Sequence, residues 1–379
     1  MKNLPGPESQ DTEFLTHLYR IFFDREPDPL GFEQHLSALR AGLPPQDLVA
    51  RFLRSNEFSA RGRPQLTKYL PLADLRCTLT LICDRTVVAV DDGRNVSFLL
   101  ESASPVEIYR IDRFRSLLAG LELPKVQDHG ILAAQLGDRA YYDIGSLAFG
   151  RLQHASPMIQ LIPDTNFFQD GGYSTIRGAA LRGKLPRWKD RRKIVFWRGS
   201  PTTHYIACDG TRIDCIAKIP RVAMCLALKD TPQADVAIMG PSQLYFVSDE
   251  NAVSWLLQRG IFRTHVPMVR HADYKFLIDI DGIANSWSFF EKLLLGSCIL
   301  KVESPFEQWF YREIAPWQHF VPVSHDLSDL IERIDWCLQH EAQAGAIAER
   351  GQQFALRHTP EAAREVVADA VSRSIIPAQ

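Results

Sequence analysis

Several features that would classify this chain of 379 residues at once are missing from its sequence. It has no run of about 18 apolar residues, so it contains no candidate for a membrane-spanning helix. Its first residues, MKNLPGPESQDTEF, lack the apolar core of a secretory signal peptide. Its formal net charge of -2 excludes the broad basic surface of a nucleic-acid-binding protein. We therefore expect a cytoplasmic location, with peripheral attachment to the inner membrane left open.

Paired cysteines are also missing. The seven cysteines are odd in number and scattered among apolar neighbours, which is typical of reduced, buried thiols. Cys208 and Cys215 lie seven residues apart, without a CxxC pair or a set of histidines that would complete a zinc site. The cysteines therefore predict no zinc site, and we expect no resident cofactor.

What the chain does contain begins with a helical region. Apolar residues follow helical spacing from Phe14 to Phe23, the PDPLG stretch predicts a stop, and Phe32, Leu36 and Leu39 predict a second helix. A third helix is predicted after Pro44 and Pro45. With its RFLRSNEF ending, the segment 11–60 resembles the phycobilisome-linker-like repeat domain, which implies a docking module and a protein partner but no chemistry.

The remainder has the pattern of an α/β protein. The segment CTLTLICDRTVVAVDDGRNVSFLLES predicts two or three strands with a hairpin turn at Asp92-Gly93. From residue 127 the apolar runs GILAAQL, SPMIQLIP, KIVFWRG, FLIDIDG and SCILKV alternate with helical or loop segments, which predicts parallel sheets with helices on both faces. The end of the chain is helical in pattern, with starts predicted at Ser328 and at Thr359-Pro360.

Ligands of open parallel sheets bind beyond the carboxyl ends of the strands, and one predicted strand, KIVFWRGS, ends in suitable residues. Arg198 offers a guanidinium fork, Gly199 lets a ligand approach the backbone, and Ser200 adds a hydroxyl. Arg221 follows at the start of the amphipathic helix VAMCLAL. Because a cation there opposes the helix dipole, its position favours a bound anion. The alternative is a plain turn after an edge strand.

A second strand end, in KFLIDIDGIANSWSFF, carries two acids. Asp279 and Asp281 resemble the metal-holding DxD motif of one glycosyltransferase class, but they equally fit a turn capped by backbone donors. After them, Asn285, Ser286 and Ser288 are residue types that cap helices, and Phe289, Phe290, Leu293 and Leu294 predict the buried face of that helix. A helix starting at a strand end is suited to binding an anion.

A third strand end, ILAAQLGD, brings Asp138 to the tip of a strand, where a catalytic carboxylate would lie. An aspartate that caps a turn is the alternative. Asp143 and Asp164 compete with Asp138 for a catalytic role.

These strand ends, in this order, resemble glycosyltransferase family 90. The resemblance covers about residues 127–357 and rests on FWRGS, YKFLIDIDGIANSWSFFEKLLLGSCILK, FEQWFYREIAPWQHFVPVSHDLSDL and IAERGQQFA. It implies a GT-B type fold of two facing Rossmann-like domains, here preceded by a small all-helical domain. The expected domains are a helical module (1–62), an acceptor-side domain (63–190), a nucleotide-sugar domain (191–357) and a C-terminal helix (358–379).

The resemblance also assigns roles to residues. It implies that Gly199 and Ser200 lie beside the nucleotide, that Arg221 and Arg198 neutralise the diphosphate, and that the loop of Ile283, Ala284, Asn285, Ser286, Trp287 and Ser288 wraps the uridine diphosphate (UDP). Animal O-glucosyltransferases end this loop with arginine, whereas this chain has Ser288. The aromatic segment around Trp309, Phe310 and Phe320 fits either the floor of the nucleotide pocket or ordinary core packing.

The implied activity is an inverting, metal-independent transfer of glucose or xylose from a UDP-sugar to a hydroxyl. Asp138 would be the general base, and positive groups would take up charge on the leaving UDP. The expected acceptor is a glycan such as a lipopolysaccharide or capsule precursor. The alternative function is a non-catalytic protein that binds sugar nucleotides or glycans within a polysaccharide-assembly complex.

Overall fold

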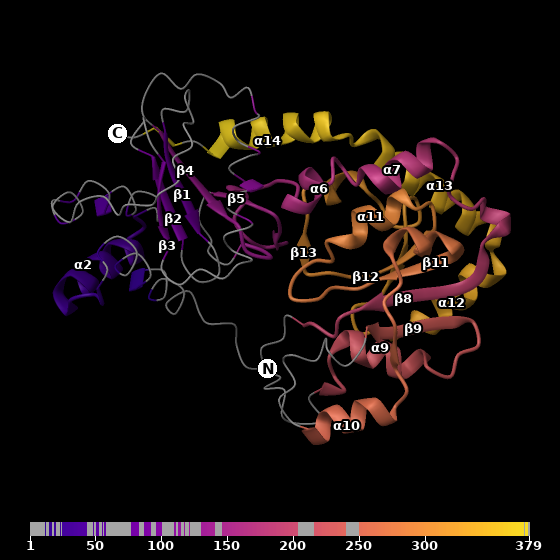
Figure 1. Ribbon diagram of the computed structural model, residues 1–379. Helices are drawn as coiled ribbons and strands as arrows, with labels where there is room; N and C mark the ends of the chain where they lie inside the picture. The colour runs from indigo at the N-terminus through magenta and orange to yellow at the C-terminus, as the bar shows by residue number, and fades with distance from the viewer. Residues whose placement is uncertain are drawn as a thin grey trace. The chain divides into compact units, whose positions relative to one another are not determined.

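The computed structural model (Figure 1) describes residues 25–43, 130–140, 146–203, 216–239, 250–374 and 376–377, three strands between 77 and 100, and isolated positions from 12 to 57 and from 110 to 121. The chain forms two units, which we treat separately. The first comprises Met1–Thr165 and Ala363–Gln379, and the second comprises Asn166–Ala362.

The N-terminal region contains the predicted second helix, α2 (Pro29–Arg40), with Leu36 and Leu39 buried. The PDPLG stretch, predicted as a stop, begins within the non-helical residues 25–28 and also starts this helix, three residues before Phe32. Asp28 is the N-cap and accepts a hydrogen bond from the Gly31 backbone N at 2.7 Å, and proline stands at the first helical position. The helix starts earlier than predicted because proline suits the first turn of a helix as well as the end of a preceding one.

The sheet of the first unit contains four parallel strands and one antiparallel strand. In the order of their pairing, β1 (Cys77–Ile82), β4 (Gly130–Gln135), β5 (Ser146–Ala148) and β7 (Ile159–Leu161) are parallel. β15 (Ile376–Pro377) returns from the C-terminus and pairs antiparallel with β4. This unit also contains the short strand β6 (Arg151–Leu152).

The predicted hairpin is present in the first unit as β2 (Val87–Asp91) and β3 (Val96–Leu100). The register pairs Asp91 with Val96, so the two strands bracket the predicted Asp92-Gly93 turn, which itself lies outside the described residues.

The second unit is built on a six-stranded sheet whose neighbouring strands all run parallel. In chain order the strands are β8 (Arg192–Gly199), β9 (Ala234–Met239), β10 (Phe262–Arg263), β11 (Tyr274–Asp279), β12 (Cys298–Val302) and β14 (Val321–Val323). Their order across the sheet is β10-β9-β8-β11-β12-β14. Counted within the unit this is 3-2-1-4-5-6, the order of doubly wound dinucleotide-binding folds. The order reverses between β8 and β11, where such sheets bind ligands.

Helices accompany this sheet along the chain. They are α6 (Thr165–Gln169), α7 (Ser174–Leu181), α9 (Pro220–Leu228), α10 (Glu250–Gln258), α11 (Ser288–Leu294), α12 (Leu330–Gln339) and α13 (Glu341–Arg357), with the short strand β13 (Phe306–Glu307) after β12. The last helix, α14 (Pro360–Ser374), has most of its residues in the first unit. Alternate strand residues such as Val195 and Ile278 join one core cluster with α9, α12 and α13. The intervening residues Phe196, Leu277 and Ile299 are also buried, so the strands are covered on both faces.

Several sequence predictions are confirmed in this unit. The runs KIVFWRG, FLIDIDG and SCILKV form parallel strands, and α14 begins after Thr359, whose Oγ1 accepts a hydrogen bond from the Ala362 backbone N. The start predicted at Ser328 is displaced: Asp329 is the N-cap of α12, and its carboxylate accepts from the Ser324 backbone N at 2.8 Å.

The division of the chain differs from the predicted domain boundaries. Residues 166–190 group with the second unit, whereas the sequence suggested a boundary at residue 190, and residues 363–379 group with the first. Arg177 of α7 explains the first difference, because its guanidinium donates to the backbone oxygens of Ala355, Leu356 and His358. That anchoring ties α7 to the end of α13.

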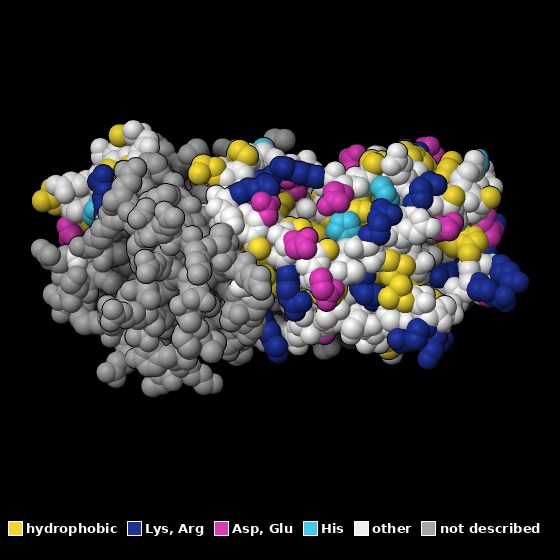
Figure 2. Space-filling model, turned by 90° about the horizontal axis from the view of Figure 1, so that it is seen from above, with side chains coloured by type: hydrophobic (Ala, Val, Ile, Leu, Met, Phe, Trp, Pro, Cys, Tyr) yellow, Lys and Arg dark blue, Asp and Glu magenta, His cyan; other side chains and the backbone are white. Residues whose placement is uncertain are grey.

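Three cysteines have described side chains. Cys225, Cys298 and Cys337 are free and buried, as predicted. The side chains of the other four lie outside the described residues. On the face drawn in Figure 2, acidic and basic side chains are interspersed, in keeping with the small net charge.

Candidate functional site

Most of the predicted site residues meet at one edge of the second-unit sheet. Arg198 and Gly199 end β8, Ser200 follows it, and Arg221 lies in the first turn of α9. The segment 283–288 joins the end of β11 to the start of α11. All of them lie beyond the carboxyl ends of β8 and β11, the two strands between which the strand order reverses. The sheet topology therefore brings together two strand ends that lie far apart in the sequence.

A cavity of about 230 Å³ opens at this place. It is lined by Trp197, Arg198, Gly199, Arg221, Met239, His265, Val266, Met268, His271, Ser286, Ser288 and Lys292. Five predicted residues therefore contribute to its wall. Ser200, Ile283, Ala284, Asn285 and Trp287 do not line it: Ile283 is exposed, whereas Ala284 and Asn285 are buried.

Arg221 joins the two strand ends. Its guanidinium donates to the backbone oxygens of Ser200, Ile280 and Asp281 and to the hydroxyl of Thr202, each at 2.9 Å. Four of its five N–H donors thus go to neutral oxygen atoms of the loops after β8 and β11. The position of Arg221 against the helix dipole, which the sequence attributed to an anion, has a second cause in these contacts.

Two glycines allow this close packing. A Cβ at Gly282 would lie 2.5 Å from the Thr202 hydroxyl oxygen and 3.0 Å from the Arg221 guanidinium carbon. A Cβ at Gly199 would lie 2.5 Å from the Trp197 ring. A larger residue at either position would displace the side chains that form the strand ends.

Arg198 is held by an acid on the neighbouring strand. It forms an ion pair with Asp235 of β9 at 2.5 Å and donates to the backbone oxygen of Asp235 at 2.8 Å. Its side chain is 6% exposed and lies over the Phe196 ring. Most of its charge is therefore balanced within the protein.

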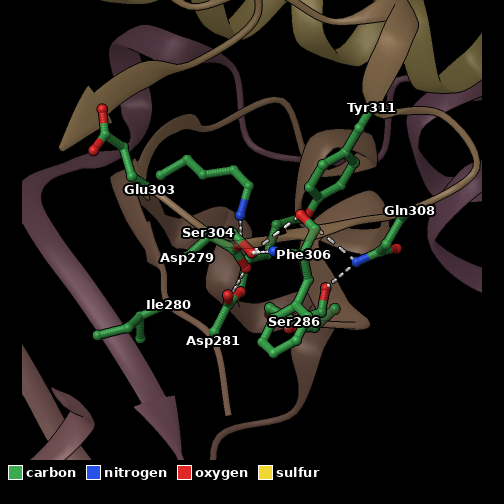
Figure 3. Close-up of polar contacts among 12 residues, drawn as sticks. Asp279, Ile280, Asp281, Ser286, Glu303, Ser304, Phe306, Gln308 and Tyr311 are labelled. Carbon is green, nitrogen blue, oxygen red and sulfur yellow. Dashed lines mark hydrogen bonds and ion pairs between the residues drawn. The ribbon is translucent and has the colours of Figure 1, made fainter. Parts of the chain in front are cut away.

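The two acids of the DxD-like stretch lie side by side but in different surroundings (Figure 3). Asp279 is completely buried and accepts hydrogen bonds from Lys292 Nζ at 2.7 Å and Lys301 Nζ at 3.0 Å. Burial alone would raise the pKa of Asp279, but the two ammonium groups hold it well below its usual value. The Asp281 carboxyl is buried as well, and there burial raises its pKa.

This arrangement bears on the metal interpretation of the DxD-like stretch. A cation that bound Asp279 would have to displace two buried ammonium groups. No group of three metal-ligating side chains occurs among the described residues.

The start of α11 differs in detail from the prediction. The helix begins at Ser288 and its buried face is formed by Phe289, Phe290, Leu293 and Leu294 as predicted, but its N-cap is Trp287 and makes no side-chain capping bond. The polar residues are used otherwise: Ser286 Oγ and Ser288 Oγ lie 3.2 Å apart, within hydrogen-bonding distance. Both serines line the cavity, although neither caps the helix through its side chain.

The aromatic segment after β13 belongs to the core. Phe310 is completely buried and packs against Phe289, Phe290 and Phe354. Trp309, Phe310 and Phe320 do not line the cavity. The suggestion that these rings form the floor of the nucleotide pocket is therefore wrong for this cavity, and the alternative of core packing holds.

Sequence reasoning missed the lysine and histidines of the cavity. His271 is buried against Phe196, its Nε2 lies 3.1 Å from the Val266 backbone oxygen, and burial lowers its pKa to about 4. Lys292 stands in the apolar stretch FFEKLLL, four residues after Ser288. A lysine on the predicted buried face was the signal that could have identified it, because lysine is rarely buried without a partner.

Asp138, the predicted base, lies in the first unit after β4. Its carboxylate accepts from Arg110 Nη2 at 2.5 Å, and Arg110 also donates to the Leu136 backbone oxygen. These contacts orient Asp138, which is partly exposed. Of its competitors, Asp164 is buried, and Asp143 lies outside the described residues.

The sequence is similar to known families and proteins. Residues 175–363 match the family model "Glycosyl transferase family 90", and residues 2–61 match a domain of unknown function, DUF4214. The chain is 30% identical over 173 residues to protein O-glucosyltransferase 2 of Danio rerio, a match that covers 46% of this chain and 30% of that protein. It is 38% identical over 93 residues to protein O-glucosyltransferase 1 of Bos taurus, covering 24% of each chain. The matched part thus spans less than a third of these relatives.

A solved structure, Anabaena Alr3699/HepE in complex with UDP-glucose, has 13% identity and a TM-score of 0.34 over 52% of each chain. No helix among the described residues is long and apolar enough to cross a bilayer. The motifs quoted from the sequence fall inside the matched segment, and two of them, FWRGS and YKFLIDIDGIANSWSFFEKLLLGSCILK, contribute residues to the wall of the cavity. Residues 175–363 of this chain belong to glycosyl transferase family 90.

Proposed function

We propose that this protein transfers a sugar from a UDP-sugar to a hydroxyl group of a glycan acceptor. The observation that carries the proposal is the cavity at the carboxyl ends of β8 and β11, where the order of a parallel sheet reverses. Doubly wound sheets bind nucleotides at this position. Membership of residues 175–363 in glycosyl transferase family 90 supports a sugar nucleotide as that ligand.

The charges around the cavity fit the diphosphate of such a ligand. Arg198, Arg221 and Lys292 contribute to its wall, and the Asp235 and Asp279 carboxylates are paired with Arg198 and Lys292. The hydroxyls of Ser286 and Ser288 add donors for phosphate oxygens. Gly199 also contributes to the wall, and its lack of a side chain leaves room for the Trp197 ring. We propose that Arg221 orders the two loops and adds positive charge to the site.

In the proposed reaction, an acceptor oxygen attacks the anomeric carbon from the side opposite the diphosphate. The new carbon–oxygen bond forms as the bond to the phosphate oxygen breaks, and the electron pair leaves with UDP. Asp138 takes the proton of the acceptor hydroxyl. Because the attack comes from the side opposite the leaving group in a single displacement, the configuration at the anomeric carbon inverts. The cations and hydroxyls of the cavity stabilise the leaving UDP without a metal ion. Glucose and xylose are the favoured sugars, and a lipopolysaccharide or capsule precursor is the favoured acceptor.

Release of UDP tests this proposal. The full chain is incubated with UDP-glucose or UDP-xylose, with and without glycan acceptors, and free UDP is measured. We expect UDP release from the unaltered protein. We expect Asp138→Asn to lower the rate by about a hundredfold or more, the usual contribution of a general base, while binding UDP as before.

Two results would count against the proposal in different ways. If Asp138→Asn transfers sugar at the original rate, the base is another carboxylate, and Asp164→Asn is the next variant to test. If the unaltered protein binds UDP and releases none with any acceptor, the non-catalytic sugar-nucleotide-binding function replaces the enzyme.

A further inference from the structure

Two buried lysines share the Asp279 carboxylate, but they have different surroundings. Lys292 Nζ lies 2.7 Å from Oδ1, and Lys301 Nζ lies 3.0 Å from Oδ2. Both lysine side chains are about equally buried. Because Asp279 carries a single negative charge, the three groups together keep one positive charge.

Lys301 is enclosed by aromatic rings. Its ammonium lies 4.6 Å from the centre of the Phe289 ring and 5.2 Å from that of Tyr311. It does not line the cavity. Burial opposes its charge, but Tyr311 and Asp279 hold the pKa of Lys301 above its usual value. Lys301 therefore pairs with Asp279 without contributing to the wall of the cavity.

Lys292 lines the cavity instead. It lies on α11 four residues after Ser288, so the two side chains stand on the same face of the helix one turn apart, and both contribute to the wall. Within the described part of the chain, its ammonium donates one hydrogen bond, to Asp279. An ammonium has three N–H donors, so two remain for a ligand.

Both arginines of the cavity already bond to protein oxygens, although Arg198 Nε is buried without a hydrogen-bond partner among the described residues. Arg198 forms an ion pair with Asp235, and Arg221 donates four hydrogen bonds to the loops after β8 and β11. If either turned toward a ligand, it would break contacts that hold the strand ends. Lys292 can donate to a ligand while keeping its bond to Asp279, whose charge Lys301 balances on the other side.

We propose that Lys292 is the residue that binds the diphosphate of the ligand and carries its negative charge as the sugar is transferred. The inference rests on the proposed function, because it takes a nucleoside diphosphate as the ligand of the cavity. Ser288 lies one turn before Lys292 on α11 and carries no charge. The positive charge on this face of the helix therefore comes from Lys292. Lys301 maintains the buried pair when Lys292 engages the phosphate.

Binding of UDP and of uridine separates the phosphate contact from the nucleoside contact. Both are titrated into the full chain and its variants by calorimetry. We expect Lys292→Met to weaken UDP binding by about tenfold or more, the loss of a charge-assisted hydrogen bond, and to leave uridine binding unchanged. We expect Lys292→Arg to retain most of the UDP affinity.

Lys292→Met also removes one partner of a buried carboxylate, so the fold needs its own control. The double variant Asp279→Asn with Lys292→Met removes both members of the pair, keeps the net charge of the three groups and leaves Lys301 in place. We expect it to fold and to lose UDP affinity as Lys292→Met does. Circular dichroism and thermal melting without ligand check each variant.

The outcomes separate a failure of the Lys292 assignment from a failure of the proposed function. If the unaltered protein binds UDP and both variants without Lys292 bind it equally well, the assignment of Lys292 is wrong, while the proposed function stands. A loss of UDP affinity accompanied by an equal loss of uridine affinity also overturns it, because it shows only damage to the pocket. If the unaltered protein binds no UDP, the proposed function fails, and the role of Lys292 fails with it.

Discussion

Each end of the second-unit sheet has an arginine that bonds to several backbone oxygens; Arg191 is buried, Arg221 is half-buried, and the two have different roles. At the amino ends of the strands, Arg191 donates to the backbone oxygens of Pro186 and Leu295 and to the Ser297 hydroxyl, at 2.8 to 3.0 Å. At the carboxyl ends, Arg221 makes four such bonds beside a cavity with further cations. The same chemistry closes one end of the sheet and shapes a binding site at the other.

The difference lies in what surrounds each guanidinium. Ser297 also donates to the Tyr274 backbone oxygen, so the contacts of Arg191 link the starts of β8, β11 and β12. β8 has eight residues and, at about 3.3 Å per residue, separates the two ends by roughly 23 Å. Changes at the amino ends should therefore alter stability alone, whereas changes at the carboxyl ends should alter ligand binding as well.

The largest effect on stability is expected for Arg191→Met. The change leaves three acceptors without their donor, two of them backbone oxygens beside buried strands. We expect the free energy of unfolding to fall by about 3 kcal/mol, with UDP affinity unchanged among the molecules that remain folded. Urea unfolding followed by circular dichroism measures the first quantity and calorimetry the second.

The neighbouring Arg192 supplies the control. Its side chain is exposed and donates to the Tyr274 hydroxyl at 2.9 Å, so Arg192→Met should cost less than about 1 kcal/mol. Equal losses for the two variants would contradict the structural role given to Arg191.

An intermediate effect is expected for Arg221→Lys. One ammonium cannot bridge four oxygen atoms on two loops, so the charge is retained but the geometry is lost. We expect UDP affinity to fall by about tenfold or more, together with a lower melting temperature. Calorimetry and thermal melting on the same samples provide the measurement.

The contrast with position 292 sharpens this prediction. Lys292→Arg should keep UDP binding, because a positive charge is sufficient at position 292. Arg221→Lys should lose it, because position 221 needs a guanidinium group that donates to several oxygen atoms at once. If Arg221→Lys binds UDP as tightly as the unaltered protein, Arg221 acts through its charge alone and does not position the loops.

The effect that is smallest at neutral pH concerns His271. Burial lowers its pKa in the fold to about 4 from the ordinary 6.5. As the pH falls through 6.5 the unfolded chain gains a proton that the folded chain does not take up until about pH 4, so the folded state loses stability over this window. The loss approaches about 1.4 kcal/mol per pH unit.

His271→Gln should remove this contribution. We expect a shallower fall in unfolding free energy between about pH 6.5 and pH 4, measured by urea titrations across that range. Above about pH 7 the imidazole is neutral in both states, so the slopes of variant and parent should agree there. Parallel curves throughout would show that another group causes the acid sensitivity.

The strands could be predicted from the sequence because their signals are local. KIVFWRG, FLIDIDG and SCILKV are short apolar runs bounded by turn residues, and each became a strand of the parallel sheet. Their joint position at a strand-order reversal explains why two strand ends far apart in sequence supply one cavity. The start of α2 and the cap of α11 were less well predicted, because proline and serine each suit more than one position.

The partners of the buried charges could not be predicted. Arg221 contacts oxygen atoms about 60 residues away along the chain, and Asp279 pairs with Lys292 and Lys301 through folding of β11, α11 and β12 against one another. The sequence showed two aspartates separated by one residue and suggested either a metal site or a capped turn. Only the three-dimensional arrangement reveals two ammonium groups on Asp279, one of them in the wall of the cavity.

The central claim is that the cavity between the carboxyl ends of β8 and β11 binds the diphosphate of a nucleotide sugar. A crystal structure of the full chain with UDP tests it most directly. We predict density for UDP in this cavity, with phosphate oxygens within hydrogen-bonding distance of Lys292 Nζ and near the Ser286 and Ser288 hydroxyls. Density for UDP elsewhere on the chain, or in the cavity with its phosphates turned away from Lys292, would contradict the account.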